Sequence, residues 1–179
     1  MPIANAFCLW VPSMVIIRQE SPADAAGVEQ LLDAGFGPDR LNKTAYRLRE
    51  GVSSIADLDY VALDDGRLCA TLRFWPVKIA GRTVLLLGPL AVDEACRGHG
   101  LGLRLMEQAL ERARQLGYRA VMLVGDLPYY AKVGFARAGD RLILPGPVDQ
   151  ARVLARELVP GGLDGVEGPV ERWERAAAA

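Results

Sequence analysis

The chain has 179 residues, of which 51% are hydrophobic and 24% are charged, and its formal net charge is −1 at pH 7. This composition is typical of a folded globular domain and argues against disorder, and the lack of a basic excess argues against a nucleic-acid partner. Three widely spaced cysteines and a single histidine, His99, match no zinc site and no disulfide framework. We therefore expect three reduced thiols in a cytoplasmic protein that holds no metal.

One domain is expected over residues 14–171, because no repeat and no interdomain linker interrupts the chain. Residues 1–13 are expected to form a flexible leader. The apolar run within them, residues 7–11, is too short to span a membrane and lacks the basic start of a signal peptide. Residues 172–179 are expected to be a frayed tail.

The first regular elements follow the leader. β-branched residues predict a short strand over residues 15–18. Ser21 is a suitable helix N-cap and Pro22 a suitable first helical residue, so a helix is predicted from there to Gly35. A second short, charged helix is predicted over residues 43–50.

A basic cluster surrounds the second predicted helix. It consists of Arg40, Lys43, Arg47 and Arg49. A cluster of this kind usually forms a solvated face. The alternative is that it attracts an anion, either an acidic substrate or a phosphate.

Strand patterns dominate the middle of the chain. The predicted strands cover residues 60–63, 67–79 and 83–92. A hairpin turn is indicated by Asp64-Asp65-Gly66, Pro76 suggests a sheet edge or a bulge, and Gly88-Pro89 interrupts the third strand. Phe74 and Trp75 are neighbours on the second strand, so one is expected in the core and the other in a pocket.

An amphipathic helix is predicted over residues 98–116, followed by a strand over 119–124 and a helical turn over 129–133. The predicted inner face of this helix carries Gly102, Leu105, Met106, Ala109, Ala113 and Leu116. Beyond Phe135 the pattern weakens, with a strand at 142–144 and a strand or short helix at 153–159.

The loop Arg97-Gly98-His99-Gly100-Leu101-Gly102 joins a strand to this helix. The first N–H groups of a helix lack intrahelical partners and, with the helix dipole, favour an anion. Glycines allow a phosphate to approach the backbone closely. The Walker sequence Gly-Lys-Ser/Thr is absent from the chain, and the glycine spacing and the preceding strands fit a dinucleotide fingerprint poorly.

Residues 85–135 resemble the GCN5-related N-acetyltransferase (GNAT) superfamily, whose cofactor motif [R/Q]-x-x-G-x-[G/A] is matched by Arg97, Gly100 and Gly102. The preceding strand residues and the segment Tyr130-Ala131-Lys132-Val133-Gly134-Phe135 strengthen the likeness. Within the superfamily the chain is similar to the small bacterial enzymes typified by YhbS. The resemblance implies a mixed α/β fold of the α+β type, with helices flanking a mostly antiparallel, twisted sheet that splays at the cofactor strand near Leu90.

The resemblance also implies site residues for acetyl-CoA. The cofactor-binding set is Leu90, Ala91 and Val92, whose backbone would pair with the pantetheine arm, and Arg97, Gly98, His99, Gly100, Leu101, Gly102 and Leu103 around the pyrophosphate. Tyr130 is the expected general acid for the departing thiolate, and the neighbouring Tyr129 is expected to pack. No metal is implied.

The general base and the acceptor stay open. Leucines occupy residues 85–87, where members of the family often carry a carboxylate, so Asp126 and ordered water are the candidates. The expected activity is direct transfer of an acetyl group to an amine in a ternary complex, with a slight preference for a small-molecule acceptor. The alternative is a non-catalytic acyl-CoA sensor. No membrane partner is expected, and a homodimer is left open.

Overall fold

The computed structural model describes residues 14–174, so the leader and the last five residues of the predicted tail lie outside the described residues. The strands are β1 (Val15–Gln19), β2 (Tyr60–Asp64), β3 (Arg67–Ile79), β4 (Arg82–Val92), β5 (Ala120–Val124), β6 (Ala136–Arg137), β7 (Leu142–Ile143), β8 (Val153–Glu157) and β9 (Gly168–Arg172). The α-helices are α1 (Ala25–Phe36), α2 (Thr44–Arg47), α3 (Leu101–Gln115) and α4 (Leu127–Tyr130). Short 3₁₀ turns lie at Pro22–Asp24, Pro38–Asn42, Ala56–Leu58, Glu94–Cys96, Ala131–Val133, Gly139–Arg141 and Gln150–Arg152.

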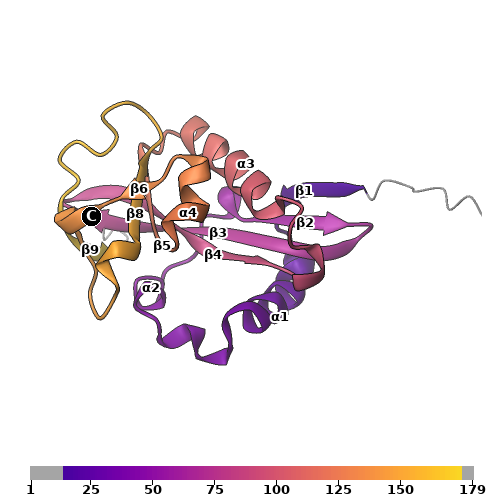
Figure 1. Cartoon of the computed structure of the whole chain (residues 1–179). Helices are drawn as coiled ribbons and strands as arrows, with labels where there is room; N and C mark the ends of the chain where they lie inside the picture. The colour runs from indigo at the N-terminus through magenta and orange to yellow at the C-terminus, as the bar shows by residue number, and fades with distance from the viewer. Residues whose placement is uncertain (1–13, 175–179) are drawn as a thin grey trace, which may run out of the picture.

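The strands form a sheet in the order β1-β2-β3-β4-β5-β8-β6, and β9 pairs with the far end of β3 (Figure 1). The β4–β5 and β7–β9 pairs are parallel, whereas the other pairs are antiparallel. Helix α3 covers one face of the sheet, and α1 and α2 lie on the opposite face (Figure 1). The expected mixed fold with a mostly antiparallel sheet flanked by helices is thus confirmed.

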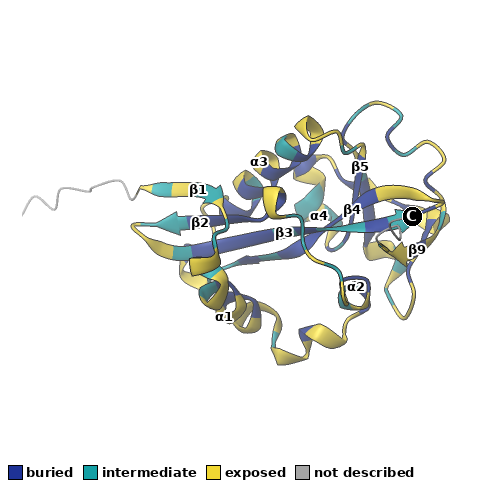
Figure 2. Cartoon of the chain, turned by 180° about the vertical axis from the view of Figure 1, so that it is seen from behind, coloured by how far each residue is buried: buried dark blue, intermediate teal, exposed yellow. Residues whose placement is uncertain are grey.

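The core lies on both faces of the central strands, because successive residues of a strand point to opposite sides. On the α3 face, Leu72 and Phe74 of β3 pack against Leu105 and Met106, and all four side chains are fully buried. The buried inner side of α3 can be followed along the sheet in Figure 2. On the α1 face, Arg73 forms ion pairs with acidic residues instead of joining the apolar core.

The strands predicted up to residue 124 agree closely with the structure, and the differences in that part of the chain lie at helix ends. Helix α3 begins at Leu101 and not at residue 98, because Gly98 and Gly100 have positive φ angles of 84° and 70°. Helix α2 covers only part of the predicted range 43–50. Leu116, predicted to face the core, follows the end of α3 and is 38% exposed.

The C-terminal region contains strand β9, which the sequence did not predict. The strand has five residues and only one buried side chain, so its sequence lacks the alternation of apolar and polar residues that predicts a strand. It also contains Pro169 and charged residues, which are uncommon in strands. Arg172, the first residue of the predicted tail, still belongs to β9 and pairs with Val77 of β3. No helix within residues 14–174 is long and apolar enough to cross a membrane.

The cysteines differ from the expectation of three reduced thiols. Cys69 of β3 and Cys96, which directly precedes Arg97, form a disulfide with their Cα atoms 5.9 Å apart. Both residues are buried, and the chain between them contains the hairpin that carries β4. Sequence spacing could not reveal the pair, because the two cysteines are brought together by strand pairing. Cys8 lies outside the described residues.

A buried carboxyl group, Asp59, connects the start of β2 to β3. It accepts hydrogen bonds from the Ser54 hydroxyl and, at 3.3 Å, from the Phe74 N–H group. Burial raises the pKa of Asp59 to about 6, and the nearby negative charge of Glu20 acts in the same direction. The folded protein therefore holds a proton that the unfolded chain, with an ordinary Asp pKa of about 3.9, releases at lower pH.

We expect this proton to make stability depend on pH. The stabilisation is complete below pH ~4 and is lost as the pH rises through about 6, so the free energy of unfolding should fall by about 2 kcal/mol over that interval. The Asp59→Asn variant should lack this fall, whereas a matched change at an exposed carboxyl, Asp57→Asn, should retain it. Urea unfolding of the three proteins at pH 4, 5, 6 and 7 measures the difference, and parallel curves would contradict the prediction.

Candidate active site

The sheet opens between β4 and β5. The two strands pair only at Leu85–Val121 and Leu86–Met122, and no pairing between them continues beyond Leu86 in the described chain. A bulge lies at this point, because β4 places one more residue than β3 between the Leu72–Leu90 and Phe74–Leu87 pairs. The edge of β4 that carries Leu90, Ala91 and Val92 is therefore left without a strand partner on the β5 side, as expected for a sheet that splays near Leu90.

The predicted phosphate loop lies at the end of this opening. The first hydrogen bond within α3 runs from the Arg104 N–H group to the Gly100 carbonyl at 3.0 Å. The N–H groups of Leu101, Gly102 and Leu103 precede this bond and have no acceptor within the helix. A Cβ atom at Gly98 or at Gly100 would meet no atom within 4 Å, so the space above the loop is open. Glycine is favoured at these two positions because of their positive φ angles.

Side chains contribute less to this loop than its backbone does. Leu101 and Gly102 are buried, and His99 is exposed. Arg97 is exposed as well, and its Nε atom donates to the Val92 carbonyl at 3.3 Å. Arg97 therefore connects the end of β4 to the loop and keeps its positive charge beside the free N–H groups.

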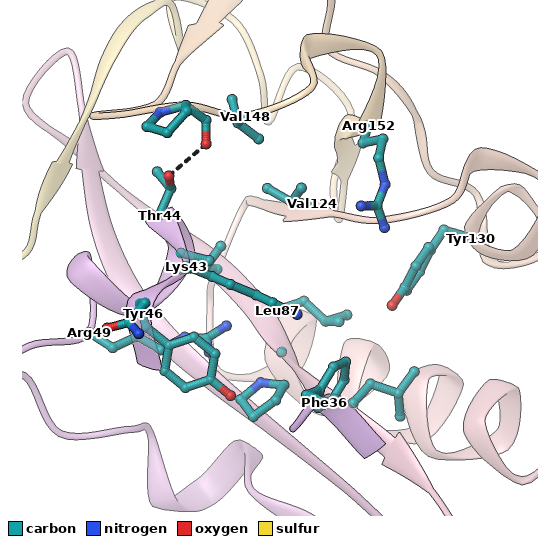
Figure 3. A pocket seen from close by; sticks show the side chains of 17 residues that line it. Phe36, Lys43, Thr44, Tyr46, Arg49, Leu87, Val124, Tyr130, Val148 and Arg152 are labelled. Carbon is teal, nitrogen blue, oxygen red and sulfur yellow. Dashed lines mark hydrogen bonds between the residues drawn. The ribbon is translucent and has the colours of Figure 1, made fainter. Parts of the chain in front are cut away.

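Tyr130 lies at the opening between the strands. It lines a pocket of about 400 Å³ together with Leu86–Leu90 of β4 and Val124 of β5. Its hydroxyl points into this pocket (Figure 3). Burial raises the pKa of Tyr130 to about 12, and the neighbouring Tyr129 and Asp126 act in the same direction, so the phenol keeps its proton at neutral pH.

Gly125 determines where the Tyr130 ring can lie. A Cβ atom at position 125 would overlap the Tyr130 ring and would also approach the Leu123 side chain. The ring contacts the face of this glycine and meets Phe135 edge-on, with 6.0 Å between the ring centroids. The packing holds the hydroxyl in one direction, which a proton donor requires.

Tyr129 packs, as expected. Its ring lies edge-on to Tyr130, with 5.1 Å between the centroids, and joins the core cluster beneath α3. Its hydroxyl occupies the space above Gly102. The two adjacent tyrosines thus have different positions, one over the helix start and the other in the pocket.

The other wall of the pocket comes from segments for which the sequence offered only one site, the alternative that the basic cluster with Lys43 and Arg49 attracts an anion. It contains Phe36 at the end of α1, residues 42–46 and 49 around α2, and Pro147 and Val148 (Figure 3). The Thr44 hydroxyl donates to the Pro147 carbonyl at 2.8 Å and so ties two of these segments together. No local pattern marks them, because they meet only in the folded chain.

The basic cluster of the sequence divides into two kinds of residue. Arg40 and Arg49 are buried, so the expectation of a solvated face is wrong for both, whereas Lys43 and Arg47 are exposed. Arg40 forms ion pairs with Glu29 and Asp33. Arg49 lines the pocket and lies over the Tyr46 ring, with 4.5 Å from its guanidinium carbon to the ring centroid.

The expected division of the two aromatic residues on β3 holds only in part. Phe74 is fully buried in the core. Trp75 does not line the pocket that holds Tyr130 but lines an adjoining one, where the Arg49 guanidinium carbon lies 5.8 Å from its ring centroid. Of the two aromatic residues near Arg49, only Tyr46 lines the pocket at the opening.

No Asp or Glu side chain is among the described residues that line the pocket. Asp126, the candidate base, is largely exposed and forms an ion pair with Arg152 at 3.2 Å. The charged side chains that do line the pocket, Lys43, Arg49 and Arg152, are all cationic. The site therefore disfavours an ammonium ion and favours a neutral amine or an anion.

A comparison of the sequence with models of protein families identifies the family of this chain. The model of the acetyltransferase (GNAT) family matches residues 26–137, which is more than half of the chain. The chain belongs to the GNAT acetyltransferase family. The matched GNAT region includes the bulged strand β4, the loop before α3 and Tyr130.

Relatives of known sequence and structure agree. The uncharacterized N-acetyltransferase YhbS of Escherichia coli (strain K12) is 35% identical over 164 residues, which cover 89% of this chain and 97% of that protein. The crystal structure of YhbS from Escherichia coli in complex with CoA has a TM-score of 0.78 at 34% identity, covering 90% of this chain and 91% of that one. A GNAT family acetyltransferase from Brucella melitensis in complex with acetyl-CoA has a TM-score of 0.67 at 28% identity, covering 92% and 98%.

Proposed function

We propose that this GNAT protein transfers the acetyl group of acetyl-CoA to the amino group of a small molecule, by direct attack within a ternary complex. The observation that carries the proposal is the opening between β4 and β5, with free helix N–H groups at one end and a pocket with the half-buried Tyr130 at the other. Two similar GNAT structures are complexes with CoA and with acetyl-CoA.

The cofactor would lie along this opening. The N–H groups of residues 98–103 and the Arg97 side chain are suited to a pyrophosphate, since each presents a hydrogen-bond donor or a positive charge to an anion. The edge of Leu90, Ala91 and Val92 that faces away from β3 has no strand partner, so its backbone groups can exchange hydrogen bonds with the amide groups of a pantetheine arm, as a further strand would. The Val92 carbonyl already accepts from the Arg97 Nε atom. This arrangement leads the thioester end toward Tyr130.

The chemistry then needs alignment and one proton donor. The amine nitrogen forms a bond to the acetyl carbon, the bond from that carbon to sulfur breaks, and Tyr130 gives its proton to the departing thiolate. The proton lost by the nitrogen restores the phenol, directly or through water. Because three cationic side chains line the pocket, the amine enters without its proton, and no carboxylate base is needed.

Thermal unfolding with and without acetyl-CoA tests cofactor binding. A ligand at about 100 times its dissociation constant stabilises the folded state by roughly 2.7 kcal/mol, which raises the unfolding midpoint of a domain of this size by about 5–10 °C. ATP and NAD serve as controls and should give no comparable shift. The absence of a shift at millimolar acetyl-CoA would contradict the proposal.

A further inference from the structure

A buried cation in the pocket has no anionic partner. Arg49 is 8% exposed, and its Nε and Nη1 atoms are buried without a hydrogen-bond partner. Among residues 14–174 it forms no ion pair, although Arg40 and Arg73 nearby are each paired with two carboxylates. A buried charge without a counter-ion is costly, so its position requires an explanation.

The protein holds this guanidinium in place without neutralising it. Its guanidinium carbon lies 4.5 Å from the centroid of the Tyr46 ring and 5.8 Å from that of the Trp75 ring, and such contacts recover part of the lost hydration. Burial lowers the pKa of Arg49 to about 10, which leaves the guanidinium charged at neutral pH. The side chain is therefore a positively charged group with donors available to bind an anion.

Arg49 lies beside the strand where the acetyl group would be placed. A Cβ atom at Gly88 would come within 3.3 Å of the Arg49 Nη2 atom, so the guanidinium contacts the bulge of β4. Tyr130 and Arg49 come from different walls of the same pocket (Figure 3). An acceptor with its amine toward Tyr130 can therefore place an anionic group against Arg49.

The other cations of the pocket are either paired with a carboxylate or exposed to solvent. Arg152 is paired with Asp126. Lys43 is exposed, and its Nζ atom lies 5.4 Å from the centroid of the Phe36 ring. One unpaired, buried guanidinium matches a single negative charge, and its planar donors match the two oxygens of a carboxylate.

We propose that Arg49 binds the carboxylate of the acceptor, so that the acceptor is a small amino-carboxylate such as a free amino acid. This inference rests on the proposed function and specifies its acceptor. The pocket of about 400 Å³ must hold the acetyl thioester as well, which limits the acceptor to a small molecule.

The test compares matched acceptors with purified protein and acetyl-CoA. The probes are the common amino acids, their carboxamides and the amines that lack the carboxyl group, and mass spectrometry detects the N-acetyl products. Free acids should be acetylated with a kcat/KM at least tenfold above that of the amide and the amine. Equal turnover of the three forms, or a preference for aminoalkylphosphonates, would overturn the inference.

Variants then show whether Arg49 recognises the carboxylate or only packs. Arg49→Met keeps the length of the side chain and should raise KM for the free acid by about tenfold to thirtyfold, with little effect on the carboxamide. Arg47→Met removes the same charge from an exposed residue nearby and should change neither value. Equal losses for acid and carboxamide in Arg49→Met would identify a structural role and overturn the inference.

Two measurements, the thermal shift with acetyl-CoA and the acetylation of amino acids, distinguish a failure of this inference from a failure of the proposed function. Protein that shows the thermal shift with acetyl-CoA but acetylates no amino acid in the panel overturns the carboxylate inference alone. Protein that shows no shift contradicts the proposed function itself.

Discussion

The Tyr130→Phe variant is expected to lower kcat by about 10²- to 10³-fold while KM for acetyl-CoA stays within about twofold. The hydroxyl is lost but the ring remains, so the packing against Gly125 and Phe135 is preserved. The thiolate must then leave without a proton from the protein, which affects the chemical step and leaves binding unchanged. Initial rates of CoA release, measured over a range of acetyl-CoA concentrations, give both constants.

Tyr129→Phe is the matched control for this variant. It removes an adjacent hydroxyl that lies above Gly102 and does not line the pocket. Its effect on kcat should stay within a few-fold. A loss as large as that of Tyr130→Phe, or full activity in Tyr130→Phe, would remove Tyr130 from the role of general acid. A chain that binds acetyl-CoA but gives no product with any amine would instead support the sensor alternative.

The Gly125→Ala variant should lose activity almost as strongly, on the order of 10²-fold in kcat. An added Cβ atom overlaps the Tyr130 ring, so the ring must turn away and the hydroxyl leaves its position. Circular dichroism and thermal unfolding with acetyl-CoA should show a folded protein that still binds the cofactor, because the phosphate loop is unchanged.

Gly35→Ala provides the control for a glycine substitution. A Cβ atom there would make only an ordinary contact, 3.7 Å from Ala91, and alanine favours the helix α1 in which it lies. This variant should keep full activity. The Gly125→Ala change should add little when Tyr130→Phe is already present, because both remove the same proton donor. Independent, multiplying losses in the double variant would show that Gly125 acts in another way.

The sequence indicated those parts of the candidate site that are continuous in the chain. The loop from Arg97 to Gly102 could be predicted because a strand, closely spaced glycines and an amphipathic helix follow one another. Tyr130 was assigned from the resemblance to the GNAT family, whose motif is matched from Tyr130 to Gly134 and Phe135 within six residues. Strand β4 and its interruption at Gly88 were visible for the same reason.

The wall of the pocket that faces β4 could not be assembled from the sequence, because its residues meet only through tertiary packing; the sequence offered no more than the alternative that its basic residues attract an anion. Arg49 follows a single helical turn, and its surroundings in the sequence resemble an exposed basic segment. Only the fold shows that Arg40 finds two carboxylates whereas Arg49 finds aromatic rings. The disulfide between Cys69 and Cys96 was missed for a related reason, since strand pairing brings residues 27 positions apart together.

The two walls of the pocket are built from different kinds of structure, and this difference determines which wall can be altered by substitution without disturbing the fold. Strand β4 is held within the sheet, whereas the facing wall consists of a 3₁₀ turn, one helical turn and the loop at Pro147, joined through Thr44. Substitutions at the pocket-lining residues 42–46 and 49 are therefore expected to alter the shape and charge offered to an acceptor without disturbing strand pairing. This segment is the place where altered substrate preference can be engineered, or can arise by mutation, while the fold, strand β4 and the loop before α3 are retained.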